Sequence, residues 1–284
     1  MPTDAHSKPA RKVNFQDTLK RHLIAYKLDK LNISDPGFFL YRGKNVQRDH
    51  ILPIEHKFRN LFEEAEPHTR QLLRDRRNPL RLHRYFHHLN SSQAFAFNLF
   101  FPYFTGGPDA SSALLRALGQ NSTLVGFKPE DVPDPEEGSN IDMVWNTDDG
   151  IQTFCEVKLS ESDFGKATDD PRHRTKLKNT YGVLAEHLEP GRFDGPAFFD
   201  AYQFNRNVWH MIRAKNNRLI FLLPRANAGL WGLVHELGSG VVPHTRERIS
   251  VMAIEDVIGE LCGDSQCPKH LREYANKLKQ KYLP

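Results

Sequence analysis

The strongest fold signal in the chain is the segment 140–159, "NIDMVWNTDDGIQTFCEVKL". Two runs rich in apolar and β-branched residues flank "DDG", a three-residue loop with Gly150 at the position that tolerates a positive φ. The segment therefore predicts an antiparallel hairpin with buried strands. Three charged residues, Asp142, Glu156 and Lys158, interrupt these strands, and buried charges are expected only where they are compensated.

The expected pairing brings the two acids together. A loop over 148–150 places Asp142 directly opposite Glu156, with Cβ atoms roughly 4.5–5.5 Å apart. Two like charges at that separation destabilise a sheet unless positive charge lies between them, and magnesium meets that need with one or two carboxylate ligands. Lys158 points to the same side as Glu156, because alternate residues of a strand share a face. Its ammonium could neutralise charge on a phosphate or orient an attacking water.

The neighbouring segments place this hairpin in a larger sheet. Residues 89–104 predict a helix buried on more than one side, and residues 122–127 predict a short strand before a proline-rich acidic loop over 128–139. Residues 197–216 predict a long amphipathic helix, and the apolar run 218–224 predicts a buried strand. The order helix, strand, strand, strand, helix, strand predicts an α/β fold with a mixed central sheet flanked by helices.

An Asp, a hairpin and Glu-x-Lys in this order of elements resemble the PD-(D/E)XK nuclease superfamily, whose restriction-endonuclease-like core is αβββαβ. The resemblance covers about residues 88–225. It implies that Asp142 and Glu156 bind magnesium, with manganese expected to substitute. It also implies that Lys158 assists the attacking water and that Val157 lends its carbonyl oxygen to the metal.

Further residues carry the same resemblance. The first core helix of the superfamily often presents a Glu or Gln to the metal, and Gln93 is the matching residue here. Ile141 stands where the superfamily usually has a proline, at a position that varies. The stretches "SSQAFAFNLF", "FCEVKLSESDFG" and "AYQFNRNVWH" look like a bacterial subgroup of restriction-endonuclease-like nucleases. Three polar residues of the last stretch share one helix face: Gln203, Arg206 and Asn207. From there they would brace Lys158 or contact phosphates.

Charge is unevenly distributed along the chain. Residues 1–90 carry 18 Lys and Arg against 10 Asp and Glu, residues 91–200 carry 9 against 18, and residues 201–284 carry 12 against 7. An acidic middle between basic segments suits a metal-binding centre that grips a polyanion, although solvated basic helices would give the same counts.

The chain divides into four expected segments. Residues 1–14 are polar and predict a disordered tail. Residues 15–87 predict a basic, mostly helical N-terminal region, with a loop over 32–53 punctuated by Pro and Gly. Residues 88–261 would form the nuclease core, and residues 262–284 a basic C-terminal helix.

These features predict a magnesium-dependent endonuclease that hydrolyses phosphodiester bonds of DNA, expected to be double-stranded, in a restriction role. A homodimer is expected for cutting both strands, because one site makes one cut. Three alternatives stay open: a DNA repair or mobile-element nuclease, a catalytically inactive DNA-binding module of the same fold, and a nuclease that acts on RNA. The sequence has no Gly-rich phosphate loop, so no nucleotide cofactor is expected.

Cellular location is predicted from apolar runs and cysteines. No stretch approaches the roughly 20 apolar residues that span a bilayer, so no membrane partner is expected. Three cysteines without a disulfide pattern fit a reducing cytoplasm. Cys155 alternates away from the two carboxylates and is predicted to lie in the core.

Other residues with metal-binding or charged side chains have simpler interpretations. His83 and His87 have the spacing of a two-histidine metal clamp on a helix, but no third ligand accompanies them. Residues 74–88, "RDRRNPLRLHRYFHH", instead predict a basic helix that faces DNA, with a solvated surface as the alternative. Glu161 and Asp163 follow the second strand and either extend the acidic site or belong to a solvated turn.

Overall fold

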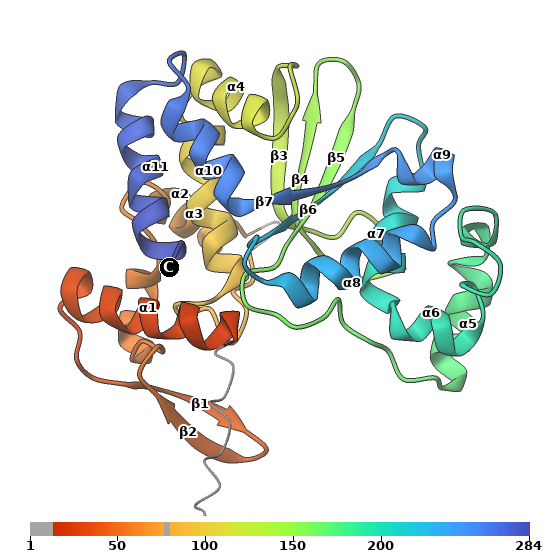
Figure 1. Cartoon of the computed structure of the whole chain (residues 1–284), viewed down its shortest axis with the longest axis horizontal. Helices are drawn as coiled ribbons and strands as arrows, with labels where there is room; N and C mark the ends of the chain where they lie inside the picture. The colour runs from red at the N-terminus through yellow and green to blue at the C-terminus, as the bar shows by residue number, and fades with distance from the viewer. Residues whose placement is uncertain (1–13, 77–79) are drawn as a thin grey trace, which may run out of the picture.

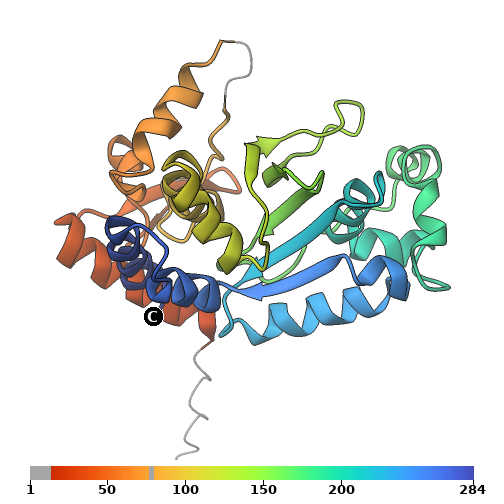
Figure 2. The same ribbon diagram turned by 90° about the horizontal axis from the view of Figure 1, so that it is seen from above.

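The computed structural model describes residues 14–76 and 80–284. Within them the fold is α/β, with a mixed five-stranded sheet between helices (Figure 1, Figure 2). The strands cross this sheet in chain order: β3 (Leu124–Asp131), β4 (Ile141–Thr147), β5 (Gln152–Val157), β6 (Arg218–Leu223) and β7 (Ile249–Ala253). The first three strands are antiparallel and the last three are parallel. The predicted mixed sheet flanked by helices is confirmed.

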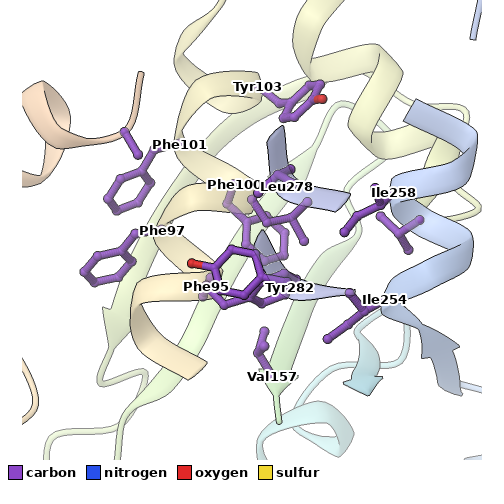
Figure 3. Close-up of a cluster of buried hydrophobic side chains, with 14 of the residues drawn as sticks. Phe95, Phe97, Phe100, Phe101, Tyr103, Val157, Ile254, Ile258, Leu278 and Tyr282 are labelled. Atoms are coloured by element: carbon purple, nitrogen blue, oxygen red, sulfur yellow. The ribbon is translucent and has the colours of Figure 1, made fainter. Parts of the chain in front are cut away.

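One face of the sheet is covered by four helices: α3 (Ser92–Thr105), α4 (Pro108–Ala117), α10 (Ile254–Gly263) and α11 (Lys269–Tyr282). Side chains of α3, α10 and α11 meet near Val157 of β5 (Figure 3). Helix α1 (Phe15–Leu31) adds Leu19 and Leu23 to the same apolar cluster. Helices from both ends of the described chain therefore share one core with the sheet.

The opposite face packs against a second apolar cluster, which includes side chains of α6 (Gly195–Asp200), α7 (Tyr202–Ile212) and α8 (Ala228–Ser239). The single amphipathic helix predicted over 197–216 is instead two helices, because helical structure is interrupted at Ala201 between α6 and α7. The shorter helices α5 (Pro171–Asn179) and η2 (Gly182–Glu186) precede α6, and α9 (Pro243–Arg246) precedes β7.

The β4–β5 hairpin has the predicted register. Met143 pairs with Cys155 and Val144 pairs with Phe154, and Gly150 in the connecting loop has a φ of 78°. Met143 and Cys155 face the cluster under α3, whereas Val144 and Phe154 face the cluster under α7. This alternation fixes the side to which every residue of the hairpin points.

Strand β3 is longer than the sequence indicates. The short strand predicted over 122–127 continues to Asp131, which pairs with Ile141. Pro129 lies inside it, and a proline is tolerated there because β3 is an edge strand with one side free of ladder hydrogen bonds. The prediction that the acidic loop begins at residue 128 is therefore wrong, and Glu130 belongs to the sheet.

The N-terminal region is not helical throughout. The loop predicted over 32–53 contains a hairpin of β1 (Gly37–Tyr41) and β2 (Lys44–Arg48). Its two turn residues, Arg42 and Gly43, have φ values of 47° and 76°, as a two-residue hairpin turn requires. The tail predicted over 1–14 lies outside the described residues, apart from Asn14 at the start of α1.

The basic helix predicted over 74–88 is wrong. Helix η1 (Ile54–Asn60) and helix α2 (Glu66–Arg74) precede this stretch, and its described residues after α2 form irregular coil and turns. Residues 77–79 lie outside the described part of the chain. Backbone hydrogen bonds to other segments hold this coil: the amide of Leu80 donates to the carbonyl of Leu72, and the amide of Leu52 donates to the carbonyl of His87.

All three cysteines are free thiols, and Cys155 is buried in the core as predicted. Across residues 14–76 and 80–284, every helix is too short or too polar to cross a lipid bilayer.

Candidate active site

Asp142 and Glu156 lie on neighbouring strands at the end of the hairpin opposite its loop. Oδ2 of Asp142 accepts a hydrogen bond from the amide of Val157 at 2.7 Å, so the Asp142 carboxylate reaches the backbone directly beside Glu156. Burial, and then the charges of Glu156 and Glu130, raise the pKa of Asp142 well above its ordinary value. The structure therefore brings the two predicted acids close together, where their negative charges repel each other.

Glu156 is held in place by three side chains. Its Oε1 accepts a hydrogen bond from Nε2 of Gln203 at 2.7 Å and lies 2.9 Å from Nζ of Lys158. Its Oε2 accepts a hydrogen bond from Nδ2 of Asn207 at 3.1 Å. Nζ of Lys158 in turn donates to Oε1 of Gln203 at 2.8 Å. Glu156, Lys158 and Gln203 thus form a closed triangle, which α7 supports from one face of the sheet.

Lys158 keeps its proton in this setting. Burial alone would lower the pKa of Lys158, but the charges of Glu156, Glu161 and Asp142 outweigh it and raise the pKa. An ammonium with so high a pKa acts as a fixed positive charge and a hydrogen-bond donor. It is poorly suited to removing a proton from water.

The three helix residues predicted to support the site have different positions. Gln203 and Asn207 contact Glu156, because α7 places residues four apart on one face. Arg206 makes no hydrogen bond to Glu156 or Lys158 among the described residues, and its buried Nε has no hydrogen-bond partner there.

Gln93 lies at the first turn of α3, where Ser91 caps the helix by accepting from the amide of Ala94. It is buried and borders the same pocket as Asp142. Its Oε1 accepts from the amide of His83 at 2.8 Å and its Nε2 donates to the carbonyl of Arg81 at 3.1 Å. Gln93 therefore joins the N-terminus of α3 to the coil that borders the site.

Glu130 is a third acid at this site, and the sequence-based prediction missed it. Its carboxylate accepts a hydrogen bond from the Asn140 amide. Burial is the main cause that raises the pKa of Glu130 to about 7, with a further contribution from Glu156, although bonds from Gln93 and Asn140 act the other way. Glu130 could have been found by continuing the strand predicted over 122–127 alongside the start of the next strand, because Pro129 pairs with Met143.

These residues surround a pocket of about 340 Å³. Its walls come from four parts of the chain, and the residues that border it include Asp142, Glu130, Asn140, Gln93, Ser160, Glu161, His83, Tyr85, His88 and Asn90. Glu156 and Lys158 are 3% and 8% exposed and are not among its lining residues. Across the described residues, no three His, Cys, Asp or Glu side chains stand arranged as ready metal ligands.

The matching family model is that of restriction endonucleases associating with ARP, and it covers residues 20–283. The chain belongs to this family. Membership indicates a nuclease. No curated protein and no solved structure matches the chain. The matched range contains every residue of the pocket, so the restriction-endonuclease family and the acidic site coincide in the chain.

Two acids beyond β5 in this restriction-endonuclease relative differ in role. Oε2 of Glu161 accepts hydrogen bonds from the amides of Leu159 and Ser160 at 2.7 and 2.8 Å, and Glu161 borders the pocket. Asp163 instead accepts from the amide of Gly165 at 2.8 Å. Glu161 thus adds negative charge at the pocket, whereas Asp163 stabilises a turn.

The histidines of the nuclease do not form the two-residue clamp considered from sequence. His83 borders the pocket, whereas Nε2 of His87 donates to the carbonyl of Phe38 at 3.0 Å. His88 is a pocket residue that the sequence did not indicate. Burial, followed by neighbouring histidines, lowers the pKa of His88 to about 3, so its ring is neutral at physiological pH.

The loop between β3 and β4 of the nuclease is anchored by Glu137. Its Oε1 accepts from the hydroxyl of Tyr181 at 2.6 Å and pairs with Nζ of Lys176 at 2.7 Å, while Oε2 lies 3.5 Å from Nε2 of His210. Ser139 also donates to this carboxylate. Burial alone would raise the pKa of Glu137, but these partners together lower it. The anchor holds the loop that leads from Glu130 to Asp142.

Proposed function

We propose that this chain is a metal-dependent endonuclease that hydrolyses phosphodiester bonds of double-stranded DNA in a restriction role. The observation that carries the proposal is the pairing of Asp142 with the Glu156–Lys158 ion pair beside one pocket. Membership in a restriction-endonuclease family supports DNA as the substrate. The pairing is also what the resemblance to PD-(D/E)XK nucleases implies. We infer accordingly that α3, β3, β4, β5, α7 and β6 make up the αβββαβ core.

The donor set at the pocket fits a hard divalent cation. Carboxylate and carbonyl oxygens are the ligands that magnesium and manganese prefer. Asp142, Glu156 and the carbonyl of Val157 would hold the ion, with Glu130 as a further acid beside them. Burial and then neighbouring acids raise the pKa values of Asp142 and Glu130, and a cation beside them would favour their ionised forms. Oε2 of Glu156 accepts one hydrogen bond, from Asn207, and so retains a lone pair for a metal, whereas Oε1 is engaged by both Gln203 and Lys158.

A bound ion would supply an activated water and would stabilise charge on the phosphate. The chain supplies the rest. The Lys158 ammonium, fixed by Glu156 and Gln203, donates to the attacked phosphate or to the incoming water. Asn140 donates a hydrogen bond to Glu130, and both residues border the pocket together with Gln93. A homodimer would place one such site on each DNA strand.

Plasmid cleavage tests the proposal. Purified protein is incubated with unmethylated supercoiled plasmid and magnesium or manganese, and the products are resolved on a gel. Lys158→Ala is expected to abolish cutting while the parent produces discrete fragments. Lys166→Ala is the matched control, because Lys166 is an exposed lysine paired with Asp200 on the surface.

Each alternative gives a different result in the same assay. A smear or branch-dependent cutting would favour a repair or mobile-element nuclease. Cutting of RNA alone would show that RNA is the substrate. A Lys158→Ala variant that cuts as well as the parent would remove the mechanism. A parent that binds DNA and cuts nothing with any divalent cation would favour the inactive DNA-binding module.

A further inference from the structure

We propose that the β1–β2 hairpin is a DNA-contacting ribbon that lies along the duplex beside the cleavage pocket and contributes to site selection. The inference rests on the proposed function, because it names the surface through which that site meets its substrate. In Figure 1 the hairpin projects from the body of the molecule beyond α1.

The hairpin exposes large apolar side chains. Phe38, Leu40 and Tyr41 are 55%, 62% and 52% exposed. Scattered apolar residues are ordinary on a protein surface, but Phe38 and Leu40 are neighbours on one face of this small sheet and form a patch there, and patches mark interaction sites. Tyr41 lies on the other face, where its ring is 6.4 Å from that of Phe39, centre to centre. A two-stranded hairpin also gains little stability by itself. Exposed apolar side chains on such a hairpin do not stabilise the free protein, so the patch calls for a binding partner.

The register gives one face of the hairpin a particular chemistry. Phe38 pairs with Gln47 and Leu40 pairs with Asn45, and paired residues of antiparallel strands point to the same side. Two apolar and two amide side chains thus share one face. Amide side chains recognise adenine edges in the major groove, and apolar side chains contact the thymine methyl group or wedge between base steps.

The charge of the hairpin favours a polyanion. Between residues 37 and 48 the chain has three basic residues, Arg42, Lys44 and Arg48, and no acidic one. All three are exposed, and the guanidinium of Arg42 lies 5.3 Å from the centre of the Tyr41 ring at the tip. Phosphates complement this charge, whereas a second copy of the same hairpin would repel it. Duplex DNA is therefore the occupant that the chemistry fits.

One face of the hairpin packs against residues that border the pocket. Phe39 points away from the amide-bearing face, and its ring packs 5.9 Å from Tyr85 and 5.4 Å from His88, centre to centre. Tyr85 and His88 border the pocket together with Asp142. Tyr85 and His88 thus lie between this face of the hairpin and the candidate cleavage site, so the opposite face and the basic tip belong to a ribbon that is fixed to the pocket wall.

Binding of a fluorescently labelled duplex by the full chain tests this inference without relying on cleavage. Anisotropy titrations are run without divalent cations over a range of salt concentrations. The variants are Arg42→Ala with Lys44→Ala, and Phe38→Ala with Leu40→Ala. The matched control is Lys215→Ala with Arg246→Ala, two exposed residues just before β6 and β7 and so at the end of the sheet away from Asp142. Circular dichroism and melting temperature verify that each variant is folded.

The two hairpin variants should differ in their salt dependence. The Arg42/Lys44 variant should weaken binding about ten-fold and lower the slope of log K against log salt by about two, because roughly 0.9 of a counterion is released for each phosphate contact. The Phe38/Leu40 variant should weaken binding about five-fold with an unchanged slope. The control should change affinity by less than about two-fold.

The outcomes separate this inference from the proposed function. Hairpin variants that bind like the control would overturn the ribbon, even if the parent cuts plasmid. Hairpin-dependent binding by a parent that cuts no plasmid would uphold the ribbon and overturn the nuclease. A Phe38/Leu40 variant that changes the sedimentation of the free protein and leaves DNA affinity intact would make the patch a protein interface and overturn the DNA assignment.

Discussion

Nζ of Lys158 lies 2.9 Å from Oε1 of Glu156, and both side chains are buried. A buried ion pair of this kind gains little net stability unless its remaining hydrogen-bond capacity is satisfied. Gln203 satisfies it by donating to Glu156 and accepting from Lys158. Gln203 therefore helps to fix the positions of the Lys158 ammonium and the Glu156 carboxylate.

Replacing Gln203 should impair cleavage more than DNA binding. Gln203→Ala removes one hydrogen bond to Lys158 and one to Glu156, and loss of such a supporting contact typically costs about 10–100-fold. We expect the cleavage rate at saturating DNA to fall by that factor, with the duplex dissociation constant within about two-fold of the parent. Gln266→Ala, at an exposed glutamine, is the control. An effect confined to the dissociation constant would contradict the positioning role.

Glu130 should be needed for metal-dependent cleavage although it is not part of the Asp-Glu-Lys pattern. Glu130→Gln keeps the shape of the side chain and its contact with Asn140 but removes one of the crowded charges. We expect roughly ten-fold or more magnesium to be required for half-maximal cutting, because fewer negative charges attract the ion. Asp131→Asn, the adjacent strand residue, is the control. An unchanged magnesium requirement in Glu130→Gln would show that this acid lies outside the reaction.

Glu137 should stabilise the loop between β3 and β4 in a pH-dependent way. Its pKa is depressed in the folded protein, so its stabilisation is present above the unfolded-state value near 4.5 and is lost as pH falls toward the folded-state value. Glu137→Gln should lower the free energy of unfolding at pH 7 by roughly 2–4 kcal/mol, because Lys176 and His210 lose their charged partner. Urea unfolding at pH 7 and pH 3 measures this. A deficit that is equally large at both values would refute the electrostatic explanation.

Lys281 should make the protein more stable as pH rises above neutrality. It is 1% exposed, its Nζ donates to the backbone and side-chain oxygens of Asn60, and burial lowers its pKa from 10.5 to about 7. Between these values the unfolded chain binds the extra proton, so the free energy of unfolding gains up to about 1.4 kcal/mol per pH unit. Any advantage of Lys281→Met over the parent should therefore shrink from pH 7 to pH 9. A constant difference in urea unfolding across that range would contradict the shift.

The hairpin site was predictable because its geometry is local. Loop length and strand alternation fix the β4–β5 register, and the structure has that register, with Met143 opposite Cys155. The position of Asp142 beside Glu156 follows from it. Gln203 and Asn207 could also be placed, since helical spacing puts both on the face of α7 that meets Glu156.

Other parts of the site depend on contacts that local patterns do not encode. Glu130 was missed because Pro129 resembles a loop residue, and only the pairing with β4 makes it part of an edge strand. Residues 80–88 line the pocket as coil, held by Gln93 and by the β1–β2 hairpin rather than by helical periodicity. The hairpin itself was hidden in a stretch of Pro and Gly, although Arg42 and Gly43 form the two-residue turn that marks it.

Calorimetric titration of the full chain with manganese tests the central claim most directly, because it reports whether the crowded acids around Asp142 share a cation. The account predicts a saturable heat for the parent, at about one ion per chain, and loss of most of that heat in Asp142→Asn. A flat trace for the folded parent, or an Asp142→Asn variant that binds manganese as the parent does, would contradict it.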